Sequence, residues 1–325
     1  MVSRSPLTLL RHLLRFGLLF AGLLHVACAG AGAGAGSGSG AFDPIVEDPP
    51  EFDSAHPPLL VETVFEVDGD GMNALIYEAQ GPGPHPTVVL LHGYPGSERN
   101  LDLAQAIRRA GWNVVFFHYR GAWGSGGEFS FIHLFEDVAA VVDAISIPSF
   151  AAEHRIDPDT IALVGHSMGA FAALVGGAEN PEVDCVVSIA GFNLGGWMRV
   201  LQDSPDQLDA TAAEVDGLSG PIKGLDESQQ NAQVLENIDR FDTTAHADIL
   251  ATKHLLLIAG ARDDVVPAAT HHAPLVAALE AASAHSLQAT VFEEGDHSFS
   301  GQRIALARVV VGFLQTGCSA TRKGA

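Results

Sequence analysis

The stretch TIALVGHSMGAFAALVGGA, residues 160–178, decides the fold. It begins with an apolar run typical of a buried strand and ends with small and apolar residues that suit a helix. Between them, GHSMG at 165–169 matches the pattern G-x-S-x-G. Glycines permit a turn so tight that the hydroxyl between them stands clear of the sheet, and the helix N-terminus then points at any anion formed there. We interpret Ser167 as a nucleophile; the alternative is a glycine-rich turn that needed a small polar residue.

Apolar runs and helical stretches alternate on both sides of this segment, which predicts an α/β protein with a mostly parallel sheet and helices on both faces. The first two runs are separated by the Gly/Asp turn DGDGM, residues 68–72, and should form an antiparallel hairpin. We expect helices near residues 99–110, 134–147, 168–178, 268–283 and 301–315. The eight expected strands are LLVETVFEV (59–67), NALIYEA (73–79), TVVLLHG (87–93), NVVFFHY (113–119), IALVGH (161–166), CVVSIA (185–190), HLLLIAG (254–260) and LQATVFE (287–293).

The first 29 residues have the layout of a secretory signal, with Arg4, Arg11 and Arg15 before an apolar block and small residues after it. The apolar block is shorter than a membrane-spanning helix requires. Cleavage near Ala27 and lipidation of Cys28 remain alternatives, and both place the mature protein in the periplasm, outside the cell, or anchored to the envelope. Residues 30–58 are rich first in Gly, Ala and Ser and then in Pro and acid, which predicts a flexible tether.

Charge and cysteine content exclude several classes of function. The chain has 325 residues and a net charge of −22, so neither nucleic acid nor an anionic membrane surface is an expected partner. If Cys28 is removed or modified, Cys185 and Cys318 remain, and we expect them to be buried thiols rather than a disulfide framework. Asp263, Asp264, His271 and His272 lack the spacing of a metal site, and no metal or cofactor is expected.

A serine hydroxyl needs a base to take its proton and a carboxylate to orient that base. Asp263 follows the seventh expected strand and His297 follows the eighth, so both lie at the carboxyl edge where open α/β sheets place their ligands. His271, His272 and His285 are interpreted as exposed helix residues. An oxyanion would accept hydrogen bonds from the N–H of Met168 and from the loop after the third strand, LLHGYPGS at 90–97.

The motifs HGYPGS, YRGAWGSGG, GHSMG, GARDDVVP and GDHSF occur in the order found in the α/β-hydrolase superfamily. Over about residues 59–316 the chain resembles the serine hydrolases grouped with esterases and with the catalytic domains of prolyl-oligopeptidase-like peptidases. The resemblance implies Ser167 as nucleophile, Asp263 as acid, His297 as base, and the N–H groups of Tyr94 and Met168 as the oxyanion hole. It also implies a small helical cap at about residues 192–250, after the sixth strand. Asp264 and Asp296 are the alternative acids.

The expected activity is hydrolysis of a small carboxylic ester through an acyl-enzyme. The alternatives are a peptidase or aminoacyl amidase, in which the cap would set selectivity because residues 1–58 are too few for a propeller, and a non-catalytic binding protein. Several aromatic and apolar residues lie in loops expected near the pocket and predict an apolar or aromatic substrate group: Trp123, Phe192 and Trp197, and also Phe129, Phe131 and Met198. The sequence does not indicate an oligomeric state.

Overall fold

The computed structural model describes residues 42–202, 220–224 and 227–318. The expected leader and the first part of the expected tether, residues 30–41, lie outside the described residues, as does part of the expected cap. Within the described residues, no helix has both the length and the apolar character needed to cross a bilayer.

Eight strands form one sheet in the order β1-β2-β4-β3-β5-β6-β7-β8, which confirms the predicted α/β-hydrolase architecture. β1 and β2 form the predicted antiparallel hairpin, β2 is also antiparallel to β4, and the remaining pairs are parallel. The parallel strands end at one edge, which collects the loops of the candidate site. The strands are β1 (Leu59–Val67), β2 (Asp70–Glu78), β3 (His85–Leu91), β4 (Asn113–Phe117), β5 (Ile156–His166), β6 (Cys185–Ile189), β7 (His254–Gly260) and β8 (Ser286–Phe292).

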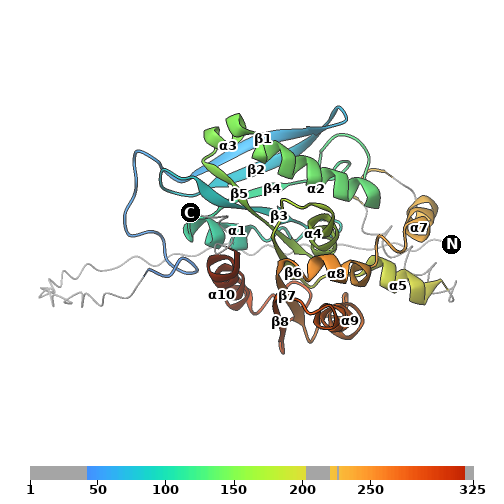
Figure 1. Cartoon of the computed structure of the whole chain (residues 1–325). Coiled ribbons are helices and arrows are strands. Elements are labelled where there is room, and N and C mark those ends of the chain that lie inside the picture. The colour runs from blue at the N-terminus through green and yellow to red at the C-terminus, as the bar shows by residue number, and fades with distance from the viewer. Residues whose placement is uncertain (1–41, 203–219, 225–226, 319–325) are drawn as a thin grey trace, which may run out of the picture. The chain divides into compact units, whose positions relative to one another are not determined.

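Helices cover both faces of this sheet (Figure 1). Because successive side chains of a strand point to opposite faces, Val89 and Leu91 of β3 join one core cluster and Val88 and Leu90 join the other. The first cluster packs α2 (Phe131–Ser146), α4 (Met168–Glu179) and α9 (Ala268–Ala281), and the second packs α1 (Leu101–Arg109) and α10 (Arg303–Phe313). The short α3 (Pro148–Glu153), which the sequence analysis did not predict, follows α2.

The insertion between β6 and β7 is helical in the residues described. It contains α5 (Leu194–Leu201), α7 (Glu227–Glu236), the 3-10 helix η1 (Thr243–His246) and α8 (Ala247–Leu250). Residues 221–224 of the insertion pair with the loop that follows β4, through bridges of Ile222 to Ala122 and of Gly224 to Phe129. The insertion is therefore joined to a loop that carries one of the predicted pocket residues, Trp123.

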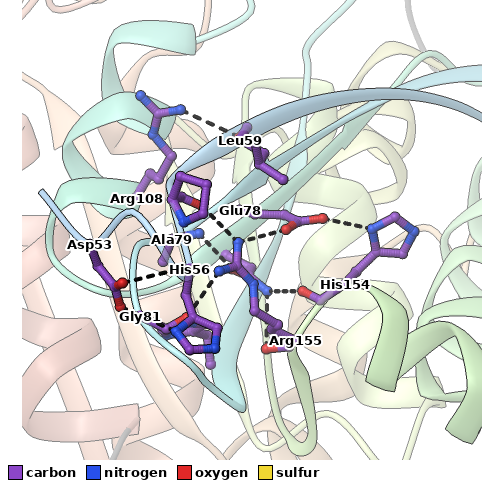
Figure 2. A network of polar contacts seen from close by, with 12 residues as sticks. Asp53, His56, Leu59, Glu78, Ala79, Gly81, Arg108, His154 and Arg155 are labelled. Atoms are coloured by element: carbon purple, nitrogen blue, oxygen red, sulfur yellow. Dashed lines mark hydrogen bonds and ion pairs between the residues drawn. The ribbon is translucent and has the colours of Figure 1, made fainter.

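Residues 42–58 pack against the sheet and its helices, which corrects the prediction of a flexible tether for this part of the chain. Arg109 donates hydrogen bonds to the carbonyls of Pro44 and Ile45, at 2.7 and 3.0 Å. Arg155 bonds the carbonyl of Pro57 at 3.0 Å and also pairs with Glu78 (Figure 2). Acid and proline content indicated an exposed segment, but arginines on the body satisfy its backbone carbonyls.

Cys185 and Cys318 form a disulfide, so the prediction of two free thiols is wrong. Cys185 begins β6, and Cys318 ends the π-helix η2 (Leu314–Cys318) that continues α10. Their Cα atoms lie 5.7 Å apart although 133 residues separate them in the chain. A pairing over such a separation depends on the fold and has no local signal in the sequence.

Reduction of this disulfide should lower the free energy of unfolding by about 2–5 kcal/mol, because the bond restricts the unfolded chain over a long loop. Urea unfolding with and without a reductant measures the loss. The variant Cys318→Ala should start from the reduced stability and show no further response to the reductant. Equal unfolding midpoints for oxidised and reduced wild-type protein would contradict the pairing.

Candidate active site

Ser167 lies between β5 and α4 with φ 58° and ψ −121°, a backbone conformation that is costly for a residue other than glycine. Glycines make room for this turn. A Cβ on Gly165 would lie 2.0 Å from the carbonyl oxygen of Gly169, and one on Gly169 would lie 2.2 Å from that of Leu91. The sequence pattern thus forms the tight strand-to-helix turn that it predicted, with the serine at its apex.

Asp263 and His297 come together from the loops after β7 and β8. One carboxylate oxygen of Asp263 accepts a hydrogen bond from Nδ1 of His297 at 2.8 Å, and the other accepts from the N–H groups of Val265 and Val266 at 2.9 and 2.7 Å. The Asp263 side chain is only 1% exposed. With the proton on Nδ1, the neutral imidazole has a free lone pair at Nε2, as a general base requires.

The two alternative acids are engaged elsewhere or exposed. Asp296 accepts a hydrogen bond from the N–H of Ser300 at 2.8 Å, and backbone and side-chain hydrogen bonds from Ser300 hold its pKa below the usual value. Asp264 is exposed. Of the three candidate carboxylates, the structure therefore places Asp263 against the histidine ring.

His166, the second residue of G-x-S-x-G, contacts the proposed base, His297. Its Nε2 donates a hydrogen bond to the backbone carbonyl of His297 at 2.7 Å, and the two ring centroids lie 4.8 Å apart. Burial, followed by the nearby charge of His297, lowers the pKa of His166 to about 4. The sequence analysis missed this contact because the motif leaves the second position undefined.

The loop after β3 carries Tyr94 and lies against the serine. A Cβ on Gly93 would lie 3.0 Å from Cβ of Ser167, so the loop backbone approaches the elbow closely. Met168, the other expected oxyanion donor, is the first residue of α4. Backbone N–H groups of a loop and of a helix start can both serve a developing oxyanion here.

Side chains hold four backbone carbonyls of this loop. Those of Gly93 and Pro95 accept from Nδ1 of His92 at 2.7 Å and from the indole N–H of Trp123 at 2.7 Å. Those of His92 and Gly96 accept from the Tyr119 hydroxyl at 3.1 Å and from Nε of Arg99 at 3.3 Å. Because these four carbonyls are bound, the loop backbone is held in place, and its N–H groups have a fixed orientation.

A second histidine continues this network. Because Nδ1 of His92 donates to a carbonyl, its Nε2 is the acceptor for Nδ1 of His118, 3.2 Å away. Burial is the main cause that lowers the pKa of His92 to about 3 and that of His118 to about 4. Both rings are therefore uncharged near neutral pH.

Stability should fall as the pH drops from about 7.5 to about 5, because His92 and His166 stay neutral in the folded protein with pKa values of about 3 and about 4. Their unfolded forms take up protons below about pH 6.5, and each histidine then costs about 2 kcal/mol at pH 5. Urea unfolding at the two pH values measures the difference. His166→Gln should show a shallower fall, and a stability that is flat or rises toward pH 5 would contradict the prediction.

The predicted pocket residues do not all lie together. Phe192 packs against Trp197 at a centroid distance of 5.4 Å, and its N–H bonds the carbonyl of Ser167 at 3.4 Å. Trp123 instead lies against the loop after β3, as described above. Phe131 is half-buried, whereas Phe129 and Met198 belong to the buried core. Phe192 and Trp197 thus lie together near the serine, and Trp123 supports the loop.

His271 is buried, so its interpretation as an exposed helix residue is wrong. Its Nδ1 accepts a hydrogen bond from the N–H of Asn193 at 3.2 Å, and its ring packs on Phe192 with centroids 4.8 Å apart. Burial lowers its pKa to about 4. No group of three or more His, Cys, Asp or Glu side chains in the described part of the chain could hold a metal ion.

Known proteins that are similar to this chain include hydrolases. A family model described as the prolyl oligopeptidase family matches residues 100–319. Esterase YjfP of Escherichia coli K12 is 28% identical over 193 residues, which cover 57% of this chain and 71% of that protein. An uncharacterized 31.7 kDa protein of E. coli, from the traX-finO intergenic region, is 32% identical over 117 residues, 35% of this chain and only 40% of the relative.

A solved structure shows the same fold. The crystal structure of 2,6-dihydroxy-pseudo-oxynicotine hydrolase superposes with a TM-score of 0.60 at 21% identity, over 83% of this chain and 71% of the other. At this identity the match speaks for the architecture alone.

Proposed function

We propose that this chain, which belongs to the prolyl oligopeptidase family, is an exported serine hydrolase. It would cleave small carboxylic esters through an acyl-enzyme, with Ser167, His297 and Asp263 as its triad. The observation that carries the proposal is the 2.8 Å hydrogen bond between Asp263 and Nδ1 of His297, whose ring packs on His166, the residue directly before a serine held in a strained turn. A purely structural role would not explain why the Asp263–His297 hydrogen bond, the strained turn and the serine at its apex occur together.

The proposed reaction has two displacements. Ser167 Oγ attacks the ester carbonyl while Nε2 of His297 takes its proton, and the N–H groups of Tyr94 and Met168 stabilise the oxyanion. Collapse breaks the bond to the alcohol, which leaves with the proton from His297. Water then gives a proton to His297 and attacks the acyl-enzyme, which releases the acid and returns the proton to Ser167. Asp263 stabilises the imidazolium in both steps.

Esters are preferred over amides as the proposed substrates because the esterase YjfP aligns with more than half of this chain. The aromatic pair of Phe192 and Trp197 near the serine favours an apolar or aromatic group on the substrate. The family match keeps a peptidase or aminoacyl amidase as the second candidate.

Export is proposed from two features that agree. The first 29 residues have the layout of a secretory signal. The disulfide between Cys185 and Cys318 is of a kind that forms and persists in oxidising compartments. Cleavage near Ala27 and a lipid anchor at Cys28 are the two routes that sequencing the mature N-terminus would distinguish.

A substrate panel tests the proposed reaction. p-Nitrophenyl esters of graded acyl length should be hydrolysed with a burst of nitrophenol, and aminoacyl and peptidyl nitroanilides should be far slower. Faster turnover of the nitroanilides would move the assignment to a peptidase. Turnover of neither class would favour a binding protein.

A further inference from the structure

Residues of β1, β2 and β4 and of the segments before α1 and after β4 line a cavity of about 430 Å³. Its size falls in the range of small-molecule sites. One wall is apolar, with Val64, Leu75 and Phe116. Arg99 and His118 also line the cavity, and they contact Gly96 and His92 of the loop after β3. This cavity has no part in the proposed ester hydrolysis.

Arg99 brings a positive charge to this cavity. Its Nε bonds the carbonyl of Gly96, and its guanidinium lies 4.2 Å from the centre of the Trp123 ring. Among the described residues, no carboxylate lies within ion-pair distance of Arg99, whereas Arg120 and Arg303 each pair with carboxylates. Arg108 and Arg109 also lack a carboxylate partner, but their terminal amino groups donate to backbone carbonyls, whereas those of Arg99 have no acceptor within the part of the chain that the structure describes.

The guanidinium is also held in place. Its Nε is bonded and one of its faces covers an indole, so two terminal amino groups remain as donors in a fixed plane. Such a planar pair of donors matches the two oxygens of a carboxylate. Three neighbouring polar groups are uncharged: Thr63 and Asn73 also line the cavity and can donate, and burial keeps His118 neutral by lowering its pKa to about 4. Glu62 is exposed at the same cavity and opposes an anion.

We propose that this cavity binds a small organic carboxylate that has an apolar body. The carboxylate pairs with the terminal amino groups of Arg99, and the apolar body packs against Val64, Leu75 and Phe116. A charge-assisted, bidentate pair fixes the orientation of the ligand, and the apolar wall adds affinity. Since Arg99 stacks on Trp123, occupancy should also change the fluorescence of that indole.

The test titrates the full chain with 3-phenylpropionate by calorimetry, with the active site first blocked by a fluorophosphonate. Blocking the serine separates this site from product binding, and if the serine does not react, the Arg99 and Glu62 variants still distinguish this cavity from the active site. Saturable binding is expected at millimolar concentrations, as is usual for a fragment of this size. The neutral analogue 3-phenylpropionamide should bind at least tenfold more weakly.

Two variants of cavity residues should change the affinity for 3-phenylpropionate in opposite directions. Arg99→Gln should weaken binding of 3-phenylpropionate at least tenfold, and Glu62→Gln should strengthen it severalfold by removing a like charge. Arg308→Gln, whose arginine pairs with Asp43 outside the cavity, is the matched control and should leave the affinity unchanged. If Arg99→Gln fails to fold, Glu62→Gln still decides the question. Equal affinity of wild type for the acid and the amide, or no effect of either cavity variant, would overturn the proposal.

Discussion

Replacement of Ser167 by alanine should reduce kcat for the best p-nitrophenyl ester by about a millionfold, since removal of the nucleophile of a triad enzyme removes the covalent route. The substitution takes away one hydroxyl at a position whose φ is 58°. Alanine tolerates this backbone about as well as serine, so the variant should fold. Rates measured at substrate saturation, with circular dichroism to check the fold, give the answer.

A matched control comes from the same part of the sheet edge. Ser298 directly follows the proposed base, and Ser298→Ala should retain activity within about tenfold because its hydroxyl has no part in the reaction. If Ser167→Ala keeps more than about a hundredth of the wild-type kcat, Ser167 is not the nucleophile.

Replacement of Asp263 by asparagine should lower kcat by about 10⁴, the second largest effect expected here. Asparagine has nearly the same shape, but its amide would present a donor or a weaker acceptor to Nδ1 of His297. The imidazole then adopts the wrong tautomer or loses the charge that stabilises its protonated form. The N–H groups of Val265 and Val266, of which the Val266 bond is buried, would also lose a charged partner.

Asp264→Asn and Asp296→Asn are the matched controls, because each removes one negative charge from the same region. Neither carboxylate is placed against the ring of His297, and both variants should keep kcat within about tenfold. A loss in Asp264→Asn that exceeds the loss in Asp263→Asn would move the acid by one residue.

The fold could be predicted from the sequence because the patterns that indicate it are local. Apolar runs of strand length, Gly/Asp turns and the glycines around Ser167 each describe a few neighbouring residues, and the order of strands follows from their right-handed connections. The motifs at Asp263 and His297 stand at strand ends, which the topology brings to one edge. The topology therefore predicted that these two loops meet, whereas the choice of Asp263 over Asp264 and Asp296 rested on the resemblance to the family.

Contacts between distant segments could not be predicted in the same way. Cys185 meets Cys318 only because α10 returns along the sheet to the start of β6. Arg109 and Arg155 hold residues 42–58 from elements far along the chain, so a composition typical of a tether gave the wrong answer. The burial of His271 was not predicted, because two adjacent histidines on a helix do not indicate which of them faces the core.

The side chains that hold the loop after β3 could be predicted only in part. His92 and His118 lie at the C-terminal ends of the predicted strands 87–93 and 113–119, so the sequence predicted both at the edge of the sheet that carries the site. Their hydrogen bond depends on β3 and β4 being neighbours, which consecutive strands usually are. The role of Trp123 was less accessible, because an aromatic residue in a loop fits a substrate pocket and a packing contact equally well.

The central claim is that Ser167 is the reactive nucleophile, and the most direct test is to label the purified protein with a fluorophosphonate and identify the modified residue by peptide mass spectrometry. The account predicts one adduct, on the peptide that contains Ser167, formed in parallel with the loss of esterase activity and absent from Asp263→Asn on the same time scale. An adduct on another residue, or complete inactivation with Ser167 unmodified, would contradict it.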